Sequence, residues 1–141
     1  RNPEYRVRLE RYVGAQNYLS MLGVQLGLVE PGRVEYRLPF RADLGQQDGV
    51  FHGGVIGGIA EGAMGAAAAT LVAAEDNVVG ADYAISLLAS GAGPTLVARA
   101  SVVKVGRLMI CRADVVNLGD DGTEQLCAIA QGTMAVVSPK R

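Results

Sequence analysis

The stretch HGGVIGGIAEGAMGAAAATLVAA, residues 52–74, decides how this chain folds. It contains the only histidine of the sequence, His52, and a single carboxylate, Glu61, in an otherwise uncharged run. From residue 55 to residue 74 only Glu61 and Thr70 are polar, which predicts a helix that is apolar on all sides and therefore buried. A carboxylate in such surroundings must reach a polar partner or bear a costly burial, and perturbed acids of this kind are common at active sites.

The predicted helix is rich in glycine, although its alanines favour a helix. Each glycine in a helix interior costs about 1 kcal/mol relative to alanine, so a packing reason is needed. Gly54, Gly58 and Gly62 recur every four residues and lie on one side of the predicted helix. We expect them to form a ridge without side chains, on which a sheet or another backbone lies.

Shorter segments precede this helix. Residues 3–21 predict one or two short helices, whose apolar side includes Tyr18 and Met21. Residues 24–29 and 33–41 then predict two strands, and the second alternates strictly between apolar positions and mostly charged ones.

Four further extended segments follow the helix, rich in valine, isoleucine and alanine and separated by turns that contain glycine. They comprise residues 78–88, 95–105, 107–117 and 125–137. A helix inserted after two strands and followed by consecutive antiparallel strands predicts an α+β fold, in which one sheet wraps around one long helix.

Composition limits the class of protein. With 141 residues, of which 50% are hydrophobic and 19% charged, the chain fits a single globular domain over residues 1–141. With a net charge of -1 the chain has no excess of positive charge, so we expect no nucleic-acid partner. Neither a membrane span nor a signal peptide is indicated, and we expect a cytoplasmic protein without a membrane partner. Cys111 and Cys127 lack the spacing of metal ligands or of a disulfide framework, so we expect neither.

The residues around His52 allow a functional and a structural interpretation. Two glycines follow His52, and their backbone N–H groups point from the N-terminus of the helix, which is positive and suits a developing oxyanion. The structural interpretation is a helix start capped by glycine, with His52 hydrogen-bonded to a loop. For Glu61 the structural alternative is a carboxylate that pairs with an arginine or caps a neighbouring turn.

The spacing of Glu61 and Gly53 argues for two chains at one site. Glu61 follows Gly53 by eight residues, so an ideal helix separates them by about 12 Å. One carbonyl group cannot touch both within one chain. If both act on one substrate, the simplest geometry is a pair of antiparallel helices from two chains, which predicts an obligate dimer with two shared sites.

These motifs resemble those of a known family. The sequence His52-Gly53-Gly54, an acid nine positions after the histidine on an apolar helix, and the approach DGVF at residues 48–51 resemble the hotdog-fold acyl-CoA thioesterases. The most similar type is the phenylacetate-degradation (PaaI-like) and 4-hydroxybenzoyl-CoA thioesterase group. The resemblance covers nearly the whole chain and implies a hotdog fold, a homodimer or homotetramer, and hydrolysis of acyl-CoA. It implies no cofactor, since coenzyme A is part of the substrate.

The resemblance also implies a role for each site residue. Glu61 matches the acid that acts as nucleophile or general base, and Gly53 matches the glycine whose N–H binds the thioester oxygen. Gln46, six residues before the histidine, matches an amide that helps to hold substrate or water. His52 then supports the loop and hydrogen-bonds near the thioester.

The chain departs from the family pattern at two hydroxyl groups. Some relatives carry a hydroxyl four residues after the acid, or a serine two residues before the aspartate of the next strand, and these positions are Gly65 and Gly80 here. A hydroxyl that would hold water is therefore missing at both places, which leaves the detailed route of hydrolysis open.

Coenzyme A carries phosphates, for which the sequence offers several cations. The turn that contains Lys104, Gly106 and Arg107 is the main candidate, with Lys140 and Arg141 as further ones. Charged turns are also commonly no more than solvated.

Two other classes of function remain open. The first is a non-catalytic module that binds acyl-CoA, as hotdog domains do in regulators of lipid synthesis. Such regulators carry a DNA-binding segment, which we do not find in this sequence, and have no need of Glu61. The second is a hotdog dehydratase or hydratase, which would place a catalytic histidine and acid in a different arrangement.

Overall fold

The computed structural model describes residues 3–140. Two short helices, two strands and a single 3-10 turn precede the long helix: α1 (Tyr5–Ala15), α2 (Asn17–Leu22), β1 (Gln25–Glu30), β2 (Arg33–Pro39), η1 (Ala42–Leu44) and α3 (Gly53–Ala69). Four strands follow: β3 (Asn77–Leu87), β4 (Thr95–Lys104), β5 (Leu108–Leu118) and β6 (Glu124–Val137). All six predicted strands are confirmed, and each lies within two residues of its predicted bounds.

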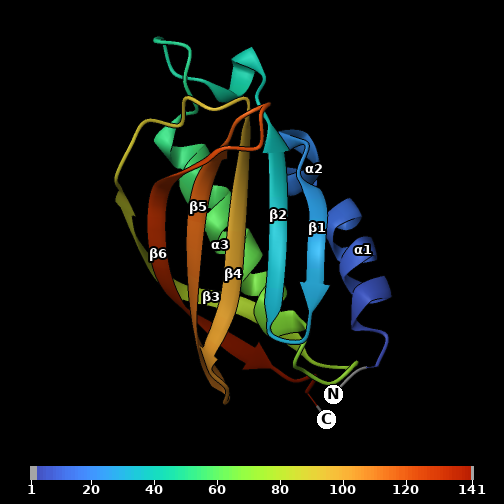
Figure 1. Cartoon of the computed structure of the whole chain (residues 1–141). Coiled ribbons are helices and arrows are strands. Elements are labelled where there is room, and N and C mark those ends of the chain that lie inside the picture. Colours follow the sequence, from blue (N-terminus) through green and yellow to red (C-terminus); the bar gives the residue numbers. More distant parts are fainter. Residues whose placement is uncertain (1–2, 141) are drawn as a thin grey trace.

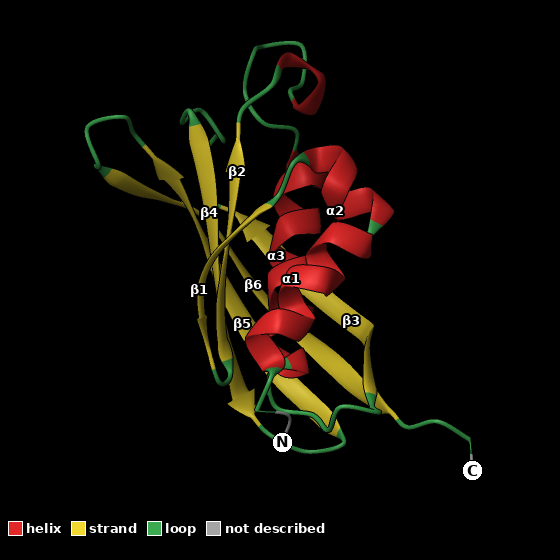
Figure 2. Ribbon diagram, turned by 90° about the vertical axis from the view of Figure 1, so that its right-hand side faces the viewer, coloured by secondary structure: helices red, strands yellow, loops and turns green. Residues whose placement is uncertain are grey.

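The six strands form one antiparallel sheet in the order β1-β2-β4-β5-β6-β3. The chain leaves β2 near one edge and re-enters the sheet at β3 on the opposite edge, so α3 crosses the sheet between them (Figure 1). All three α-helices lie on the same side of the sheet (Figure 2). The predicted α+β fold, with one sheet around one long helix, is confirmed.

Alanine lets α3 lie close to the sheet. Ala60, Ala63 and Ala67 are fully buried against inward-facing side chains such as Tyr36 and Leu96. The helix contacts β2, β3, β4, β5 and β6. The core therefore sits between α3 and the sheet, as the hydrophobic composition of the helix predicts. No helix in the described part of the chain is long and apolar enough to cross a membrane.

The C-terminal end of α3 differs from the prediction, because the helix stops at Ala69 and not at residue 74. The side chain of Thr70 donates to the carbonyl oxygen of Ala67 at 2.7 Å and accepts from the backbone N–H of Gly32 at 2.7 Å. Thr70 thereby ties the end of the helix to the β1–β2 turn. No glycine or proline marks this end in the sequence, since a tertiary contact defines it.

The prediction for the glycine ridge of α3 is wrong about what covers it. Side chains lie on the ridge, and neither a sheet nor another backbone does. A Cβ added at Gly58 would lie 2.7 Å from the hydroxyl oxygen of Tyr18, and one added at Gly62 would lie 3.3 Å from Leu19 and from Tyr36. Tyr18 and Leu19 come from α2, which packs over this side of α3, and Tyr36 comes from β2. Tyr18 and Met21, which were predicted on the apolar side of their helix, are 49% and 63% exposed.

Candidate active site

His52 is the residue that starts α3. Its backbone is extended, and its ring Nδ1 accepts a hydrogen bond of 2.8 Å from the N–H of Gly54. In the neutral ring this assigns the proton to Nε2, because an accepting nitrogen carries none. The structural interpretation of His52 is therefore correct in part: the side chain caps the helix. The backbone N–H of His52 also donates to the carbonyl oxygen of Leu44 in the preceding loop segment, at 2.9 Å.

The cap leaves the N–H of Gly53 free. His52 occupies the N–H of Gly54, while the N–H groups of Val55 and Ile56 donate to the carbonyl oxygen of His52. Within the described part of the chain, the N–H of Gly53 donates to no protein acceptor. One backbone donor at the positive end of a 17-residue helix is thus available to a ligand.

Gln46 lies in the loop that leads to this helix end. The loop is closed by hydrogen bonds between Gln46 and Val50 and between Gly49 and Gln46, at 2.9 and 3.1 Å. The side-chain oxygen of Gln46 accepts from the N–H of Asp48. This contact fixes the orientation of the amide and leaves its NH₂ group without a protein acceptor among residues 3–140.

Gln46 and Gly53 share one cleft. It has a volume of about 470 Å³ and lies between the start of α3, the end of β3 and the segment that follows β3. The cleft, called here the Gly53 cleft, is lined by Gln46, Val50, Phe51, Gly53, Ile56, Leu87, Leu88, Ala89, Ser90 and Gly91. The structure brings together two of the four predicted catalytic residues here, and Glu61 is not among the lining residues.

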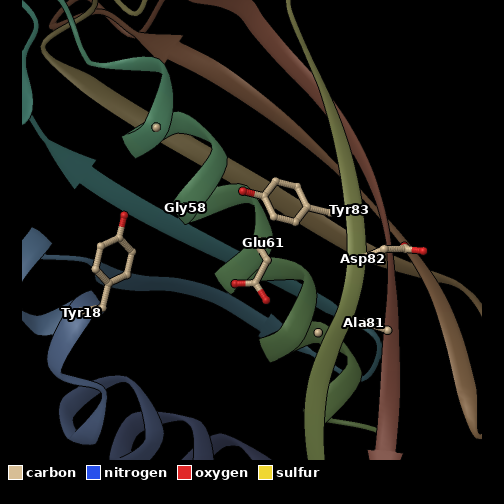
Figure 3. A pocket seen from close by; sticks show the side chains of 8 residues that line it. Tyr18, Gly58, Glu61, Ala81, Asp82 and Tyr83 are labelled. Carbon is tan, nitrogen blue, oxygen red and sulfur yellow. The ribbon is translucent and has the colours of Figure 1, made fainter.

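Glu61 lies in a second cleft of about 580 Å³, two helical turns farther along α3. This cleft, called here the Glu61 cleft, is lined by Tyr18, Gly54, Gly58, Glu61, Gly80, Ala81, Asp82 and Tyr83. Tyr18 from α2 and Tyr83 from β3 flank the carboxylate (Figure 3). Asp82 lies on the far side of β3 in this view, with its carboxylate directed away from Glu61, and accepts from the N–H of Thr133 at 3.2 Å.

The surroundings of Glu61 favour the protonated carboxyl. Across residues 3–140, Glu61 forms no hydrogen bond or ion pair, so the predicted alternative of an arginine partner is absent there. Burial raises the pKa of Glu61 above its usual value of 4.5. Burial also raises the pKa values of Tyr12 and Tyr36, and the charge of Glu61 adds to both shifts. A half-buried carboxylate without a cationic partner is a stronger base than one in water.

A β-bulge in β3 shapes the Glu61 cleft. The register between β3 and β6 shifts between Gly80 and Asp82, so Ala81 is an extra residue. In a regular strand, residues three apart point to opposite faces. The bulge instead turns both Gly80 and Tyr83 toward α3, where a Cβ at Gly80 would lie 2.6 Å from Oε1 of Glu61. Sequence reasoning missed Tyr83, because no pattern in residues 77–87 signals the bulge.

The two glycines that replace family hydroxyls differ in their surroundings. At Gly80 a side chain would collide with the carboxylate of Glu61, so the long acid occupies the space that a serine would need. At Gly65 an added Cβ would have only Met134 Sδ near it, at 3.9 Å, which is an ordinary contact. The missing hydroxyl therefore has a steric reason at Gly80 and none at Gly65.

The predicted phosphate-binding residues lie elsewhere. Lys104 ends β4, and Gly106 and Arg107 form the exposed turn to β5. This turn is at the opposite end of the sheet from the loop that holds Gln46 (Figure 1), and it lines neither cleft. Lys140 is exposed, and Arg141 lies outside the described residues.

The structure describes no site for a metal. Over residues 3–140, no three side chains of histidine, cysteine, aspartate or glutamate gather as metal ligands would. Both cysteines are free and buried. Burial raises the pKa of Cys111 to about 11, so the thiolate form is suppressed.

Comparisons with known proteins identify the family. The model of the thioesterase superfamily matches residues 48–122, just over half of the chain. A thioesterase family protein from Silicibacter pomeroyi is 29% identical, with a TM-score of 0.92, and the match covers 96% of this chain and 99% of that one. No match was found among curated proteins.

Two further solved structures share the fold at lower identity. A thioesterase from Haemophilus influenzae is 24% identical, with coverage of 92% of this chain and 88% of that one and a TM-score of 0.81. The PaaI protein from the phenylacetic acid degradation operon of E. coli is 17% identical, with coverage of 97% and 96% and a TM-score of 0.84. Together with the strand order around α3, these matches show that the chain has the hotdog fold and belongs to the thioesterase superfamily.

Proposed function

We propose that the protein is an acyl-CoA thioesterase, in which Glu61 acts on the thioester carbon and the N–H of Gly53 from the neighbouring subunit polarises the carbonyl. The observation that carries this proposal is the carboxylate of Glu61, which is half-buried in an open cleft, has no partner within residues 3–140, and has a pKa raised by burial. Membership of the thioesterase superfamily supplies the substrate class.

The proposed chemistry assigns proton transfer to Glu61 and stabilisation of the oxyanion to Gly53. As general base, Glu61 takes a proton from water, and the oxygen of that water attacks the carbonyl carbon. The negative charge on the carbonyl oxygen is stabilised by the N–H of Gly53. The C–S bond then breaks, and the leaving thiolate receives the proton that Glu61 holds. As nucleophile, Glu61 would instead attack the carbonyl carbon directly, the C–S bond would break to release the thiolate, which takes a proton from solvent, and water would hydrolyse the resulting anhydride to the free acid and the carboxylate of Glu61.

The two clefts of one chain support a shared site. Glu61 and Gly53 line different clefts, although both clefts lie between α3 and β3. Gly57 is halfway between Gly53 and Glu61 along α3. A two-fold axis that passes beside Gly57 would place the Glu61 cleft of each subunit against the Gly53 cleft of its partner.

The exposed edge of the sheet supports the same dimer. Among the described residues β3 pairs only with β6, which leaves its other edge open. Apolar side chains are exposed along this edge, with Val79 at 50%, Tyr83 at 46% and Leu87 at 56%. A free strand edge with exposed apolar side chains favours pairing with a second chain. We propose a homodimer, alone or as half of a tetramer.

A complementation experiment tests the shared site. Gly53→Pro removes the N–H, and proline suits this place because it is the first residue of the helix and His52 before it is extended. Gly53→Ala is the matched control, since it adds a similar Cβ beside the mobile end of Leu87 and keeps the N–H. We expect Gly53→Pro to lower kcat about 100-fold more than Gly53→Ala does.

The second arm mixes Gly53→Pro with Glu61→Ala subunits. A shared site gives each mixed dimer one intact site, so random exchange restores about a quarter of the wild-type activity. A site within one chain restores none, because every chain then carries one defect. Free thiol is followed with a panel of acyl-CoA thioesters. Wild type that binds these esters without releasing thiol is a binding module, and wild type that hydrates enoyl thioesters without releasing thiol is a hydratase.

The cationic turn is proposed to bind the phosphates of coenzyme A. Lys104 and Arg107 are exposed and lie at the end of the sheet that an antiparallel partner would bring toward the Gly53 cleft. We expect the double variant Lys104→Ala/Arg107→Ala to raise KM for an acyl-CoA and to leave KM unchanged for the acyl-pantetheine thioester, which lacks the nucleotide. Equal effects on both substrates would contradict this role.

A further inference from the structure

Two phenol groups are the hydroxyl donors of the Glu61 cleft. Of the residues that line it, only Tyr18 and Tyr83 carry a side-chain O–H group. Neither hydroxyl forms a hydrogen bond with another residue in the described part of the chain, and the two side chains are 49% and 46% exposed. Figure 3 shows them on either side of Glu61, one from α2 and the other from β3.

Both hydroxyls rest on the helix one turn before Glu61. The oxygen of Tyr18 would lie 2.7 Å from a Cβ at Gly58, and the oxygen of Tyr83 would lie 3.4 Å from a Cβ at Gly57. Residues three and four apart on a helix are neighbours, with Cβ positions separated by about 5–6 Å. Glu61 and the two phenols line the same cleft, and Oε1 of Glu61 faces Gly80 on β3, so a water molecule in this cleft can hydrogen-bond to a phenol and to the carboxylate.

The glycines and the bulge make this arrangement possible. A side chain at Gly58 would displace the phenol of Tyr18, whereas a Cβ at Gly57 would touch the phenol of Tyr83 at the ordinary contact distance of 3.4 Å. The bulge at Ala81 turns Tyr83 toward α3, and bulges next to active sites commonly redirect a side chain in this way. At Gly80 a serine hydroxyl is excluded by the carboxylate itself. The hydroxyl donor that β3 offers to this cleft is therefore at position 83 and not at position 80.

We propose that the hydroxyls of Tyr18 and Tyr83 together hold the attacking water beside Glu61. They are positioning residues, since they act through the water whose proton Glu61 accepts. The proposal rests on the proposed function, in its general-base form. It assigns the water-holding contacts to α2 and to the bulged part of β3, on opposite sides of the carboxylate.

Conservative variants test the proposal. Tyr18→Phe and Tyr83→Phe keep the rings and remove only the hydroxyls, and Tyr5→Phe, which lines neither cleft, is the matched control. We expect each cleft variant to lower kcat about tenfold, with KM changed less than twofold and thermal unfolding unchanged. Because one water serves both hydroxyls, the double variant should lose less than the product of the two single losses.

The possible outcomes distinguish failure of this inference from failure of the proposed thioesterase function. Absence of thiol release from wild type contradicts the proposed function. If wild type releases thiol and both Tyr18→Phe and Tyr83→Phe keep full kcat, only the inference is wrong. A rise in KM at constant kcat also contradicts the inference, because it assigns the phenols to substrate binding. Because Tyr83 lies near the proposed two-fold axis, sedimentation is measured as well. If Tyr83→Phe loses activity only by dissociating while Tyr18→Phe stays active, the inference is wrong.

Discussion

The two sides of α3 use small residues for opposite purposes. On the side toward the sheet, Ala60, Ala63 and Ala67 are fully buried, and their methyl groups fill the contact with the strands. On the side toward α2 and β3, the glycines leave room that tyrosine side chains and the Glu61 cleft occupy. Alanine therefore provides contact at one side of the helix, and glycine provides space at the other.

The difference has an energetic consequence. Each glycine in the helix costs about 1 kcal/mol relative to alanine, and the half-buried carboxylate of Glu61 adds a cost of desolvation. The cleft side thus lowers stability while the sheet side supplies it, a division that is common where a site must stay open for chemistry. Changes on the cleft side should mainly alter activity, and changes on the sheet side should mainly alter stability.

The largest effect is expected from Glu61→Gln, which removes the base and keeps the shape of the side chain. We expect kcat to fall about 1000-fold, within the range of general-base catalysis. Glu75→Gln, at an exposed position beyond the helix, is the control and should have full activity. Thiol release measures both. A Glu61→Gln variant as active as wild type would remove Glu61 from the mechanism.

The second-largest loss of activity is expected from Gly80→Ala. The added Cβ would lie 2.6 Å from Oε1 of Glu61 and must displace the carboxylate. Misplacement of a catalytic group by about 1 Å can cost about 100-fold in rate, and we expect a loss of that order in kcat. The double variant Glu61→Asp/Gly80→Ser, with a shorter acid beside a hydroxyl, should be more active than Gly80→Ser alone. Equal activity of these two variants would show that the side chains at positions 61 and 80 do not compete for the same space.

The pH dependence follows from the raised pKa of Glu61. In the proposed mechanism the base is the carboxylate form of Glu61, so kcat should fall on the acid side with a midpoint above 4.5. Between 4.5 and the raised pKa the folded protein binds more protons than the unfolded chain, so its stability decreases as pH rises through this window. Glu61→Gln should therefore raise Tm at neutral pH and change it little below pH 4.5. A rise in Tm that is independent of pH would contradict burial as the cause.

The smallest effect is expected from Gly65→Ala, a glycine of the cleft side that no close contact explains. Its Cβ would meet only Met134 Sδ, at 3.9 Å, so alanine should raise the free energy of unfolding by about 0.5–1 kcal/mol. Gly62→Ala is the counterpart, since its Cβ would press on buried Leu19 and Tyr36 at 3.3 Å, and it should be destabilising. Denaturant unfolding compares the two. Equal stabilisation by both would mean that the ridge is not packed as described.

Most of the fold could be predicted, because hydrophobic periodicity depends on local sequence. The alternation in residues 33–41 gave β2, where Val34, Tyr36 and Leu38 face the core. The spacing of Gly53 and Glu61 predicted a separation of about 12 Å, and the two residues line different clefts of the chain. The end of α3 was wrong, because the contact that ends it joins Thr70 to Gly32, far away in sequence.

The sequence by itself determined the α+β architecture, the long apolar helix and the position of Glu61 on it, since composition and periodicity act through neighbouring residues. Only the tertiary structure decided what surrounds that carboxylate. The packing of α2 over the glycine ridge brought Tyr18 to Glu61, and the bulge at Ala81 turned Gly80 and Tyr83 toward it. Both depend on contacts between segments distant in sequence, and such contacts leave no periodic pattern along the chain.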